Sequence, residues 1–224
     1  MARKNQTART QGKTAANSTT RRVATNRAPR TALVTGSARG IGAAIAQHLA
    51  RKGITVALHY RSSRQEALEV LSQCQEFAPE SLLLRADLVN EKQARELCEE
   101  AEDALGGIDL LVNNVGNYLR KELLDMTVDE WRDQLESNLY TAFHTCHAIV
   151  PAMMDRGFGR VINIGYAGGQ QAFYNKLTVP YHIAKTGVHI LTRSLAGIAA
   201  RKGVTVNCIG MGVIENSIRK PKDI

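Results

Sequence analysis

The chain has 224 residues, of which 44% are hydrophobic and 22% charged, and this composition suits one sizeable domain. Its formal net charge of +8 lies entirely in residues 1–30, which hold eight basic side chains and no acid. The neutral body argues against a nucleic-acid-binding surface, and no apolar run reaches the about 20 residues of a membrane span. Four scattered cysteines without a CxxC pair favour free thiols in a reducing compartment, such as the cytoplasm, and indicate no metal site.

Residues 1–30 form a basic tail that carries too few large apolar side chains to fold, so we expect disorder. Three roles fit this composition. The simplest is a solvated extension. An Arg-rich, Ser/Thr-rich and acid-free segment also fits a mitochondrial or plastid transit peptide. A tail that binds nucleic acid or another acidic partner is the third.

Short aliphatic strands alternate with helices through the rest of the chain, and no internal domain boundary shows between residues 31 and 224. Such alternation predicts an α/β fold: a doubly wound, Rossmann-type parallel sheet between two layers of helices. The predicted strands cover residues 31–35, 54–60, 81–86, 108–112, 159–164 and 204–208. The predicted helices cover residues 41–52, 64–76, 90–105, 127–154 and 178–200.

The sequence TGSARGIG at residues 35–42 joins the first predicted strand to the first helix. Glycines there let the backbone turn tightly and approach a pyrophosphate, whose charge a helix N-terminus stabilises. This placement predicts a dinucleotide-binding loop rather than an ordinary turn. The candidate cofactor residues of the loop are Gly36, Ser37, Arg39, Gly40, Ile41 and Gly42.

The end of the second predicted strand should contact the adenine ribose of the cofactor. An enzyme that uses NAD usually presents an acid there, whereas this chain has Tyr60, Arg61 and Ser62. Guanidinium groups suit phosphate oxygens, so Arg61 and Arg39 favour NADP(H), which carries a 2′-phosphate. The alternative is a solvated basic turn.

Four further motifs follow the loop in order: Asp87-Leu88, Asn113-Asn114-Val115-Gly116, Asn138 and the YxxxK sequence Tyr181-His182-Ile183-Ala184-Lys185. With the TGxxxGxG spacing of the loop, they resemble the short-chain dehydrogenase/reductase family over roughly residues 31–218. The sequence HYRS at residues 59–62 further resembles β-ketoacyl carrier-protein reductases and pteridine reductases. The resemblance implies further cofactor contacts at Asp87, Leu88, Asn114, Val115, Gly116, Tyr181, Lys185, Gly212 and Ile214.

The resemblance also implies a reaction, the NADPH-dependent reduction of a small-molecule carbonyl or the reverse oxidation of an alcohol. Tyr181 would exchange the proton, and Asn138 would hold a water that links Lys185 to solvent. Lys185 lies one helical turn from Tyr181, so its ammonium should lower the phenol pKa from about 10 by about 1–3 units. The resemblance places the dimer interface of such enzymes on helices 127–154 and 178–200, which predicts a homodimer.

The chain departs from the family pattern at a position that the family uses in catalysis. The family serine of the loop after the fifth strand falls on Gly168 or Tyr166, and residues 161–180 contain no serine. Loss of one oxyanion donor costs roughly 100- to 1000-fold in rate. Either the Tyr166 hydroxyl takes over, or the protein is a catalytically impaired, regulatory dinucleotide binder.

Two other departures lie near the C-terminus. Met211-Gly212 replaces the family's Pro-Gly after the sixth strand, so the rigid turn is lost. The family usually continues through another helix and a seventh strand, and we expect both to be missing here. A third reading, in which the tail binds a partner and the fold serves as its scaffold, remains open.

Overall fold

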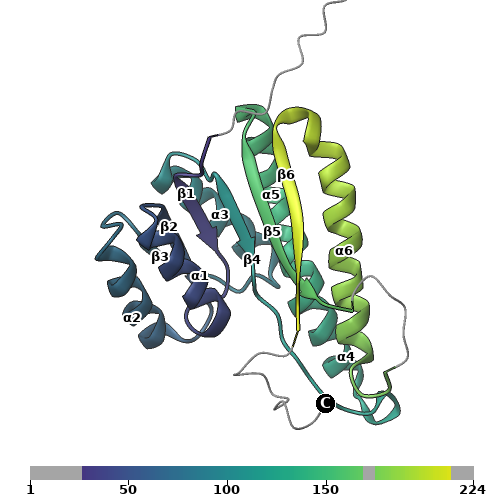
Figure 1. Cartoon of the computed structure of the whole chain (residues 1–224). Helices are drawn as coiled ribbons and strands as arrows, with labels where there is room; N and C mark the ends of the chain where they lie inside the picture. The colour runs from purple at the N-terminus through teal and green to yellow at the C-terminus, as the bar shows by residue number, and fades with distance from the viewer. Residues whose placement is uncertain (1–26, 169–174, 213–224) are drawn as a thin grey trace, which may run out of the picture.

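The computed structural model describes residues 27–168 and 175–212. Six parallel strands form one sheet in the order β3-β2-β1-β4-β5-β6 (Figure 1). The prediction of a doubly wound parallel sheet is confirmed. The strands are β1 (Thr31–Val34), β2 (Thr55–Tyr60), β3 (Leu82–Arg85), β4 (Leu110–Asn113), β5 (Gly159–Tyr166) and β6 (Val204–Met211).

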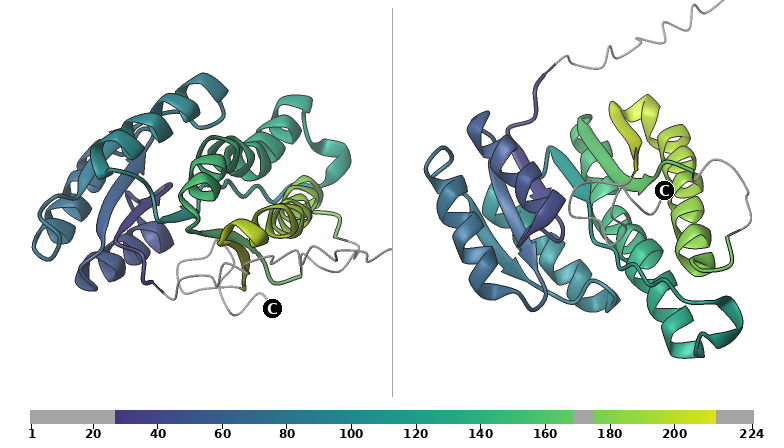
Figure 2. Two further views of the ribbon diagram at one scale, coloured as in Figure 1. Left: turned by 90° about the horizontal axis from the view of Figure 1, so that it is seen from above. Right: turned by 60° about the horizontal axis from the view of Figure 1, so that its bottom comes forward.

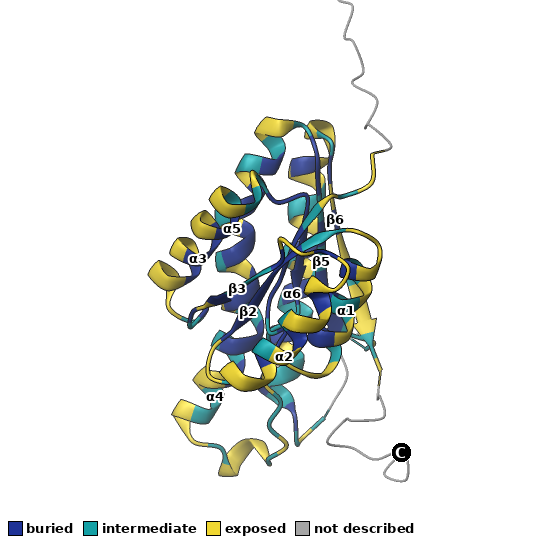
Figure 3. Cartoon of the chain, turned by 90° about the vertical axis from the view of Figure 1, so that its left-hand side faces the viewer, coloured by how far each residue is buried: buried dark blue, intermediate teal, exposed yellow. Residues whose placement is uncertain are grey.

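Helices cover both faces of the sheet, which gives the three layers (Figure 2). One face is covered by α1 (Gly40–Arg51) and α2 (Arg64–Gln75), whose buried residues pack on β1 and β2. The other face is covered by α3 (Glu91–Leu105), α5 (Thr141–Arg156) and α6 (Val179–Ala199). Their inward faces are buried and their outer faces exposed (Figure 3). Among the described residues, no helix is long and apolar enough to cross a membrane.

The helix expected over residues 127–154 is divided into three segments. It begins at α4 (Val128–Leu135), continues through a π-helical turn at Glu136–Tyr140 and ends as α5. Thr127 and Glu130 form a capping box at its start, each side chain bonding to the other's backbone N–H. A π-helical turn contains one extra residue, and such turns often lie at functional sites. Asn138 lies within this one.

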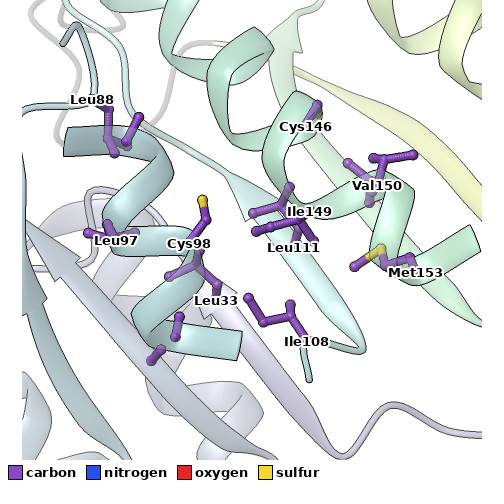
Figure 4. Close-up of a cluster of buried hydrophobic side chains, with 14 of the residues drawn as sticks. Leu33, Leu88, Leu97, Cys98, Ile108, Leu111, Cys146, Ile149, Val150 and Met153 are labelled. Atoms are coloured by element: carbon purple, nitrogen blue, oxygen red, sulfur yellow. The ribbon is translucent and has the colours of Figure 1, made fainter. Parts of the chain in front are cut away.

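The apolar core is largest between the sheet and the α3–α5 layer (Figure 4). Leu33 of β1 and Leu111 of β4 are fully buried there against Ile149 and Met153 of α5. The strands β1, β2 and β4 are almost continuously buried because helices cover both of their faces, whereas β6 alternates buried and exposed residues. Cys98 and Cys146 are also buried in this cluster as free thiols, and burial raises the pKa of each to about 12.

A chain of buried polar side chains crosses this apolar layer. The Asn113 amide donates to Asn163 Oδ1 at 2.9 Å, and the Asn163 amide donates to Thr192 Oγ1 at 2.9 Å. Thr145 donates to Asn113 Oδ1 at 2.6 Å. These bonds join β4, β5, α5 and α6. Since a buried polar group without a partner costs about 1–3 kcal/mol, they fix where α6 lies against the sheet.

The segment before β1 is attached to the amino-terminal end of the sheet. Arg27 pairs with Asp109 at 2.6 Å, and its guanidinium lies 4.7 Å from the centre of the Phe158 ring. The Arg30 N–H donates to Asp109 Oδ2 at 2.9 Å. Arg27 and Arg30, which precede the expected boundary at residue 31, therefore contact the body. Residues 1–26 of the predicted tail lie outside the described residues.

Candidate active site and cofactor cleft

A cleft of about 470 Å³ opens at the carboxyl ends of the strands. It lies beside β1 and β4, where the strand order reverses direction, which is the usual ligand position in open α/β sheets. Most of the predicted cofactor residues line it: Gly36, Arg39, Ile41, Tyr60, Arg61, Ser62, Asp87, Leu88, Asn114, Val115 and Gly116.

The glycine loop requires glycine at particular positions. Gly36 and Gly40 have φ of 64° and 58°, in the left-handed region that other residues rarely adopt. A Cβ on Gly42 would lie 2.3 Å from the carbonyl oxygen of Gly36, so α1 can approach the loop only because residue 42 has no side chain. This close approach of backbone fits a bound pyrophosphate.

Hydrogen bonds join the loop after β1 to the loop after β4. The Asn114 amide donates to the carbonyl oxygens of Thr35 and Gly36, each at 3.0 Å. In return, Thr35 Oγ1 accepts from the N–H groups of Asn114 at 2.9 Å and Val115 at 3.2 Å. The cleft walls are therefore fixed relative to each other.

His59 lines the cleft, although no role was predicted for it. Its side chain is buried, Nδ1 accepts from the Gly36 N–H at 3.0 Å, and Nε2 lies 3.1 Å from the Ala86 carbonyl oxygen. Because Nδ1 accepts, the proton of the neutral ring must be on Nε2. Burial lowers the pKa of His59 to about 4, which keeps the ring neutral. His59 thus holds the glycine loop to the end of β3.

Ser37 is the loop residue that the structure places differently from the prediction. Its side chain is fully buried, and Oγ exchanges hydrogen bonds with the backbone N–H and carbonyl oxygen of His59. It supports the loop from behind and does not line the cleft. Gly40 and Gly42 shape the backbone without lining the cleft.

The predicted ribose end of the cleft carries two exposed basic side chains and an exposed hydroxyl group. These belong to Arg39, Arg61 and Ser62, which all lie at the rim. No acid follows β2, but Asp87 after β3 lies 3.9 Å from the Arg61 guanidinium. Asp87 itself accepts from the Val89 N–H at 3.1 Å.

Asn138 and Lys185 point at the same place beside Gly116. The Asn138 amide donates to the Asn117 carbonyl oxygen at 2.7 Å and to that of Gln134 at 3.0 Å. A Cβ on Gly116 would lie 2.5 Å from Asn138 Oδ1 and 3.3 Å from Lys185 Nζ, so only glycine fits. Asn138 Oδ1 is buried and has no hydrogen-bond partner among the described residues. An orphaned acceptor beside an ammonium suits a bound water or cofactor group.

Tyr181 and Lys185 lie near the start of α6, as the YxxxK spacing predicts. Lys185 is buried, and its ammonium donates to the Ile164 carbonyl oxygen at 2.8 Å. Burial lowers the Lys185 pKa to about 8. Nζ lies 5.9 Å from the centre of the Tyr181 ring.

The prediction that Tyr181 has a lowered pKa is wrong for this structure. Burial, with smaller effects from the Tyr118 and Tyr166 phenols, raises the pKa of Tyr181 to about 12. Desolvation disfavours the charged phenolate, and the Lys185 ammonium donates to the Ile164 carbonyl oxygen instead. Tyr181 therefore stays protonated at neutral pH.

The aromatic surroundings of Tyr181 were only partly predicted. Tyr166, at the end of β5, lies edge-on to Tyr181 with ring centres 6.0 Å apart, and 4.7 Å from the His182 ring. Tyr118, which the sequence analysis did not identify, lies closer to Tyr181 at 4.9 Å. Gly212 is exposed just after β6 and does not line the cleft, and Ile214 lies outside the described residues.

The comparisons with known proteins agree with this geometry. Residues 30–223 match the short chain dehydrogenase family. The chain belongs to that family. It is 34% identical to the 3-oxoacyl-acyl-carrier-protein reductase FabG of Staphylococcus epidermidis, over 83% of this chain and 75% of that protein. It is also 34% identical to the D-beta-hydroxybutyrate dehydrogenase of Rhizobium meliloti, over 83% of this chain and 71% of that protein.

The structural comparison points the same way. A single-residue variant of actinorhodin polyketide ketoreductase with NADPH superposes with a TM-score of 0.77 and 31% identity, over 83% of this chain and 71% of that one. The chain is thus an oxidoreductase of a family that binds nicotinamide dinucleotides. Among the described residues, no group of three or more His, Cys, Asp or Glu side chains could hold a metal ion.

The buried neutral His59 predicts an acid-sensitive fold. Unfolded histidine binds its proton at about pH 6.5 and folded His59 at about pH 4, so between these values the unfolded chain binds more protons. Stability should therefore fall by roughly 3 kcal/mol as pH drops from 6.5 to 4. Urea unfolding across this range measures it.

His59→Leu should remove this dependence while lowering stability at pH 7 by about 1–3 kcal/mol, because the Gly36 N–H loses its partner. The exposed His48 provides the control, since His48→Gln should keep the wild-type pH profile. Parallel profiles for His59→Leu and wild type would contradict this account.

Proposed function

We propose that the protein is an NADPH-dependent carbonyl reductase. The observation that carries this proposal is the convergence of Tyr181, Lys185 and Asn138 beside a cleft whose opposite end carries arginines. The glycine loop, the tied cleft walls and the orphaned Asn138 oxygen fit a dinucleotide. NADPH, when bound, supplies the hydride.

The chain's own residues would supply and return the proton. Tyr181, protonated at neutral pH, donates its phenolic proton to the carbonyl oxygen as that oxygen gains negative charge. The Lys185 ammonium then stabilises the phenolate that remains. Asn138 Oδ1, next to Lys185, accepts a hydrogen bond from a water that relays a proton from solvent. Tyr166 takes the place of the family serine as a donor to the substrate oxygen.

The preference for NADPH over NADH is supported by charge. Arg39 and Arg61 are exposed at the rim of the cleft, where a 2′-phosphate accepts hydrogen bonds from guanidinium groups. No acid follows β2 to accept a bond from a 2′-hydroxyl. The polyketide ketoreductase neighbour holds NADPH, which supports the same cofactor here.

The relatives support one substrate class. FabG acts on a 3-oxoacyl group and the structural neighbour is a polyketide ketoreductase, so we propose an activated ketone such as a β-ketoacyl thioester. A pteridine-type substrate is the alternative that the HYRS sequence suggests. The missing serine favours a second function, that of a catalytically impaired dinucleotide-binding regulator.

The Tyr181→Phe variant tests the reaction. Its kcat for β-ketoacyl thioesters, quinones or dihydropterins should fall on the order of 10²- to 10⁴-fold, because the acid is lost. Its NADPH affinity, measured by fluorescence titration, should stay within a few-fold of wild type. The exposed Tyr140 offers a matched Tyr140→Phe control that should keep full activity. A wild-type protein that binds NADPH but reduces none of these carbonyls would support the regulatory function instead.

The Arg61→Ala variant tests the cofactor preference. Loss of a charge-assisted hydrogen bond should weaken NADPH binding by roughly 10- to 100-fold and leave NADH binding almost unchanged. Titrating both cofactors measures this difference. Arg95→Ala, on the exposed face of α3, is the control and should alter neither affinity. Equal weakening for NADPH and NADH would refute a 2′-phosphate role for Arg61.

We also propose a homodimer that uses the outer faces of α4, α5 and α6. Exposed apolar side chains lie on these helices: Val128, Phe143, Ile183, Ile190 and Ile198. Burying such a patch against a second copy would remove apolar surface from water. Light scattering should give twice the 24.5 kDa chain mass, and Phe143→Glu should halve it.

A further inference from the structure

Tyr118 lies beside the proposed catalytic residues but belongs to none of the family motifs. It lies two residues after Gly116, in the segment that follows β4, and its side chain is half-buried. Its ring meets Tyr181 edge-on, with ring centres 4.9 Å apart and an interplanar angle of 85°. No other described tyrosine ring lies as near to Tyr181, since Tyr166 is 6.0 Å away.

The backbone around Tyr118 is fixed on both sides. The Tyr118 N–H donates to Asn117 Oδ1 at 2.8 Å, and the Asn117 amide donates to Asp133 Oδ2 at 2.7 Å. The Leu119 N–H donates to the side-chain oxygen of Gln134 at 3.1 Å. These bonds attach Tyr118 to α4, so it is held in place rather than loosely exposed.

The same segment is joined to the entry of α6, which carries Tyr181. The Lys121 N–H donates to the Leu177 carbonyl oxygen at 2.8 Å, and the Leu123 N–H to that of Lys176 at 3.1 Å. Asn138 contributes too, because its amide donates to the Asn117 carbonyl oxygen. Tyr118 and Tyr181 are thus placed relative to each other by bonds on both segments.

Tyr118, Tyr166 and Tyr181 form one cluster of phenols, because the rings of Tyr118 and Tyr166 both lie edge-on to the Tyr181 ring. A tyrosine hydroxyl is a hydrogen-bond donor as well as an acceptor. A phenol beside the proton donor can give a hydrogen bond to the same oxygen that receives the proton.

We propose that the Tyr118 hydroxyl is a second hydrogen-bond donor to the carbonyl oxygen of the substrate, acting with Tyr166 in place of the missing serine. This inference rests on the proposed carbonyl reductase function. Tyr181 breaks its O–H bond and gives its proton to the oxygen, while Tyr118 keeps its proton. Tyr118 stabilises the negative charge that develops on the oxygen, an effect that exists mainly in the transition state.

The test compares Tyr118→Phe, Tyr166→Phe and the double variant in the full-length chain, using a carbonyl that the wild type reduces. Phenylalanine keeps the ring that packs on Tyr181 and removes only the hydroxyl. Each single variant should lose roughly 10- to 100-fold and the double variant on the order of 10²- to 10³-fold. Both kcat and kcat/KM should fall together, with KM nearly unchanged.

Two further measurements separate this role from a structural one. Thermal unfolding of Tyr118→Phe should match wild type, and NADPH affinity should be unchanged. Tyr140→Phe again serves as the control for removing a tyrosine hydroxyl elsewhere.

The possible failures are distinguishable. If wild type is active but Tyr118→Phe keeps full kcat and the double variant equals Tyr166→Phe, the Tyr118 role is overturned and the reductase function stands. If Tyr118→Phe loses activity only in proportion to a lost stability, Tyr118 is structural and the proposal again fails. If wild type reduces no carbonyl in the panel, the proposed function fails. The Tyr118 role, which rests on that function, then fails too.

Discussion

The hydrogen bond between Asn113 and Asn163 is the constraint on which the arrangement of the site depends. It joins neighbouring strands inside an otherwise apolar layer, and both amides continue the chain of bonds to helices on the same face. An apolar interface would tolerate small sliding of α6, because dispersion contacts are weakly directional. A buried amide chain does not, since every slipped bond leaves a desolvated group without a partner. The position of Tyr181 and Lys185 along the sheet is therefore set from within the core.

A similar principle orders the opposite wall of the cleft. The neutral ring of His59, the Ser37 hydroxyl and the Asn114 amide each satisfy backbone groups in or beside the glycine loop. The loop is thus shaped before any ligand arrives, so binding has little ordering entropy to overcome. His59 and Asn114 both line the cleft and hold the loop, whereas Ser37 is buried behind the loop.

The sequence predicted the fold almost completely, because the spacing of apolar residues in short strands and amphipathic helices indicates which side chains are buried. It also placed the glycine loop and the Tyr181–Lys185 pair, whose spacing is set within one local element. It missed the π-helical turn at Asn138, since one extra residue shifts the apolar repeat by a single position, which leaves the segment reading as one continuous helix. His59 and Tyr118 were missed for another reason. Their importance lies in contacts between segments distant in sequence, such as His59 with Ala86 and Tyr118 with Tyr181. The predicted pKa of Tyr181 failed because helical spacing shows proximity to Lys185 but not desolvation.

The contacts of Arg27 and Arg30 with Asp109 hold the segment before β1 at the end of the sheet opposite the cleft. Asp109 lies at the amino-terminal ends of the strands, whereas the cleft opens at their carboxyl ends. A protein tethered through its N-terminal segment, whether to an anionic surface, a fused domain or a solid support, would therefore present its cleft to the solvent on the far side.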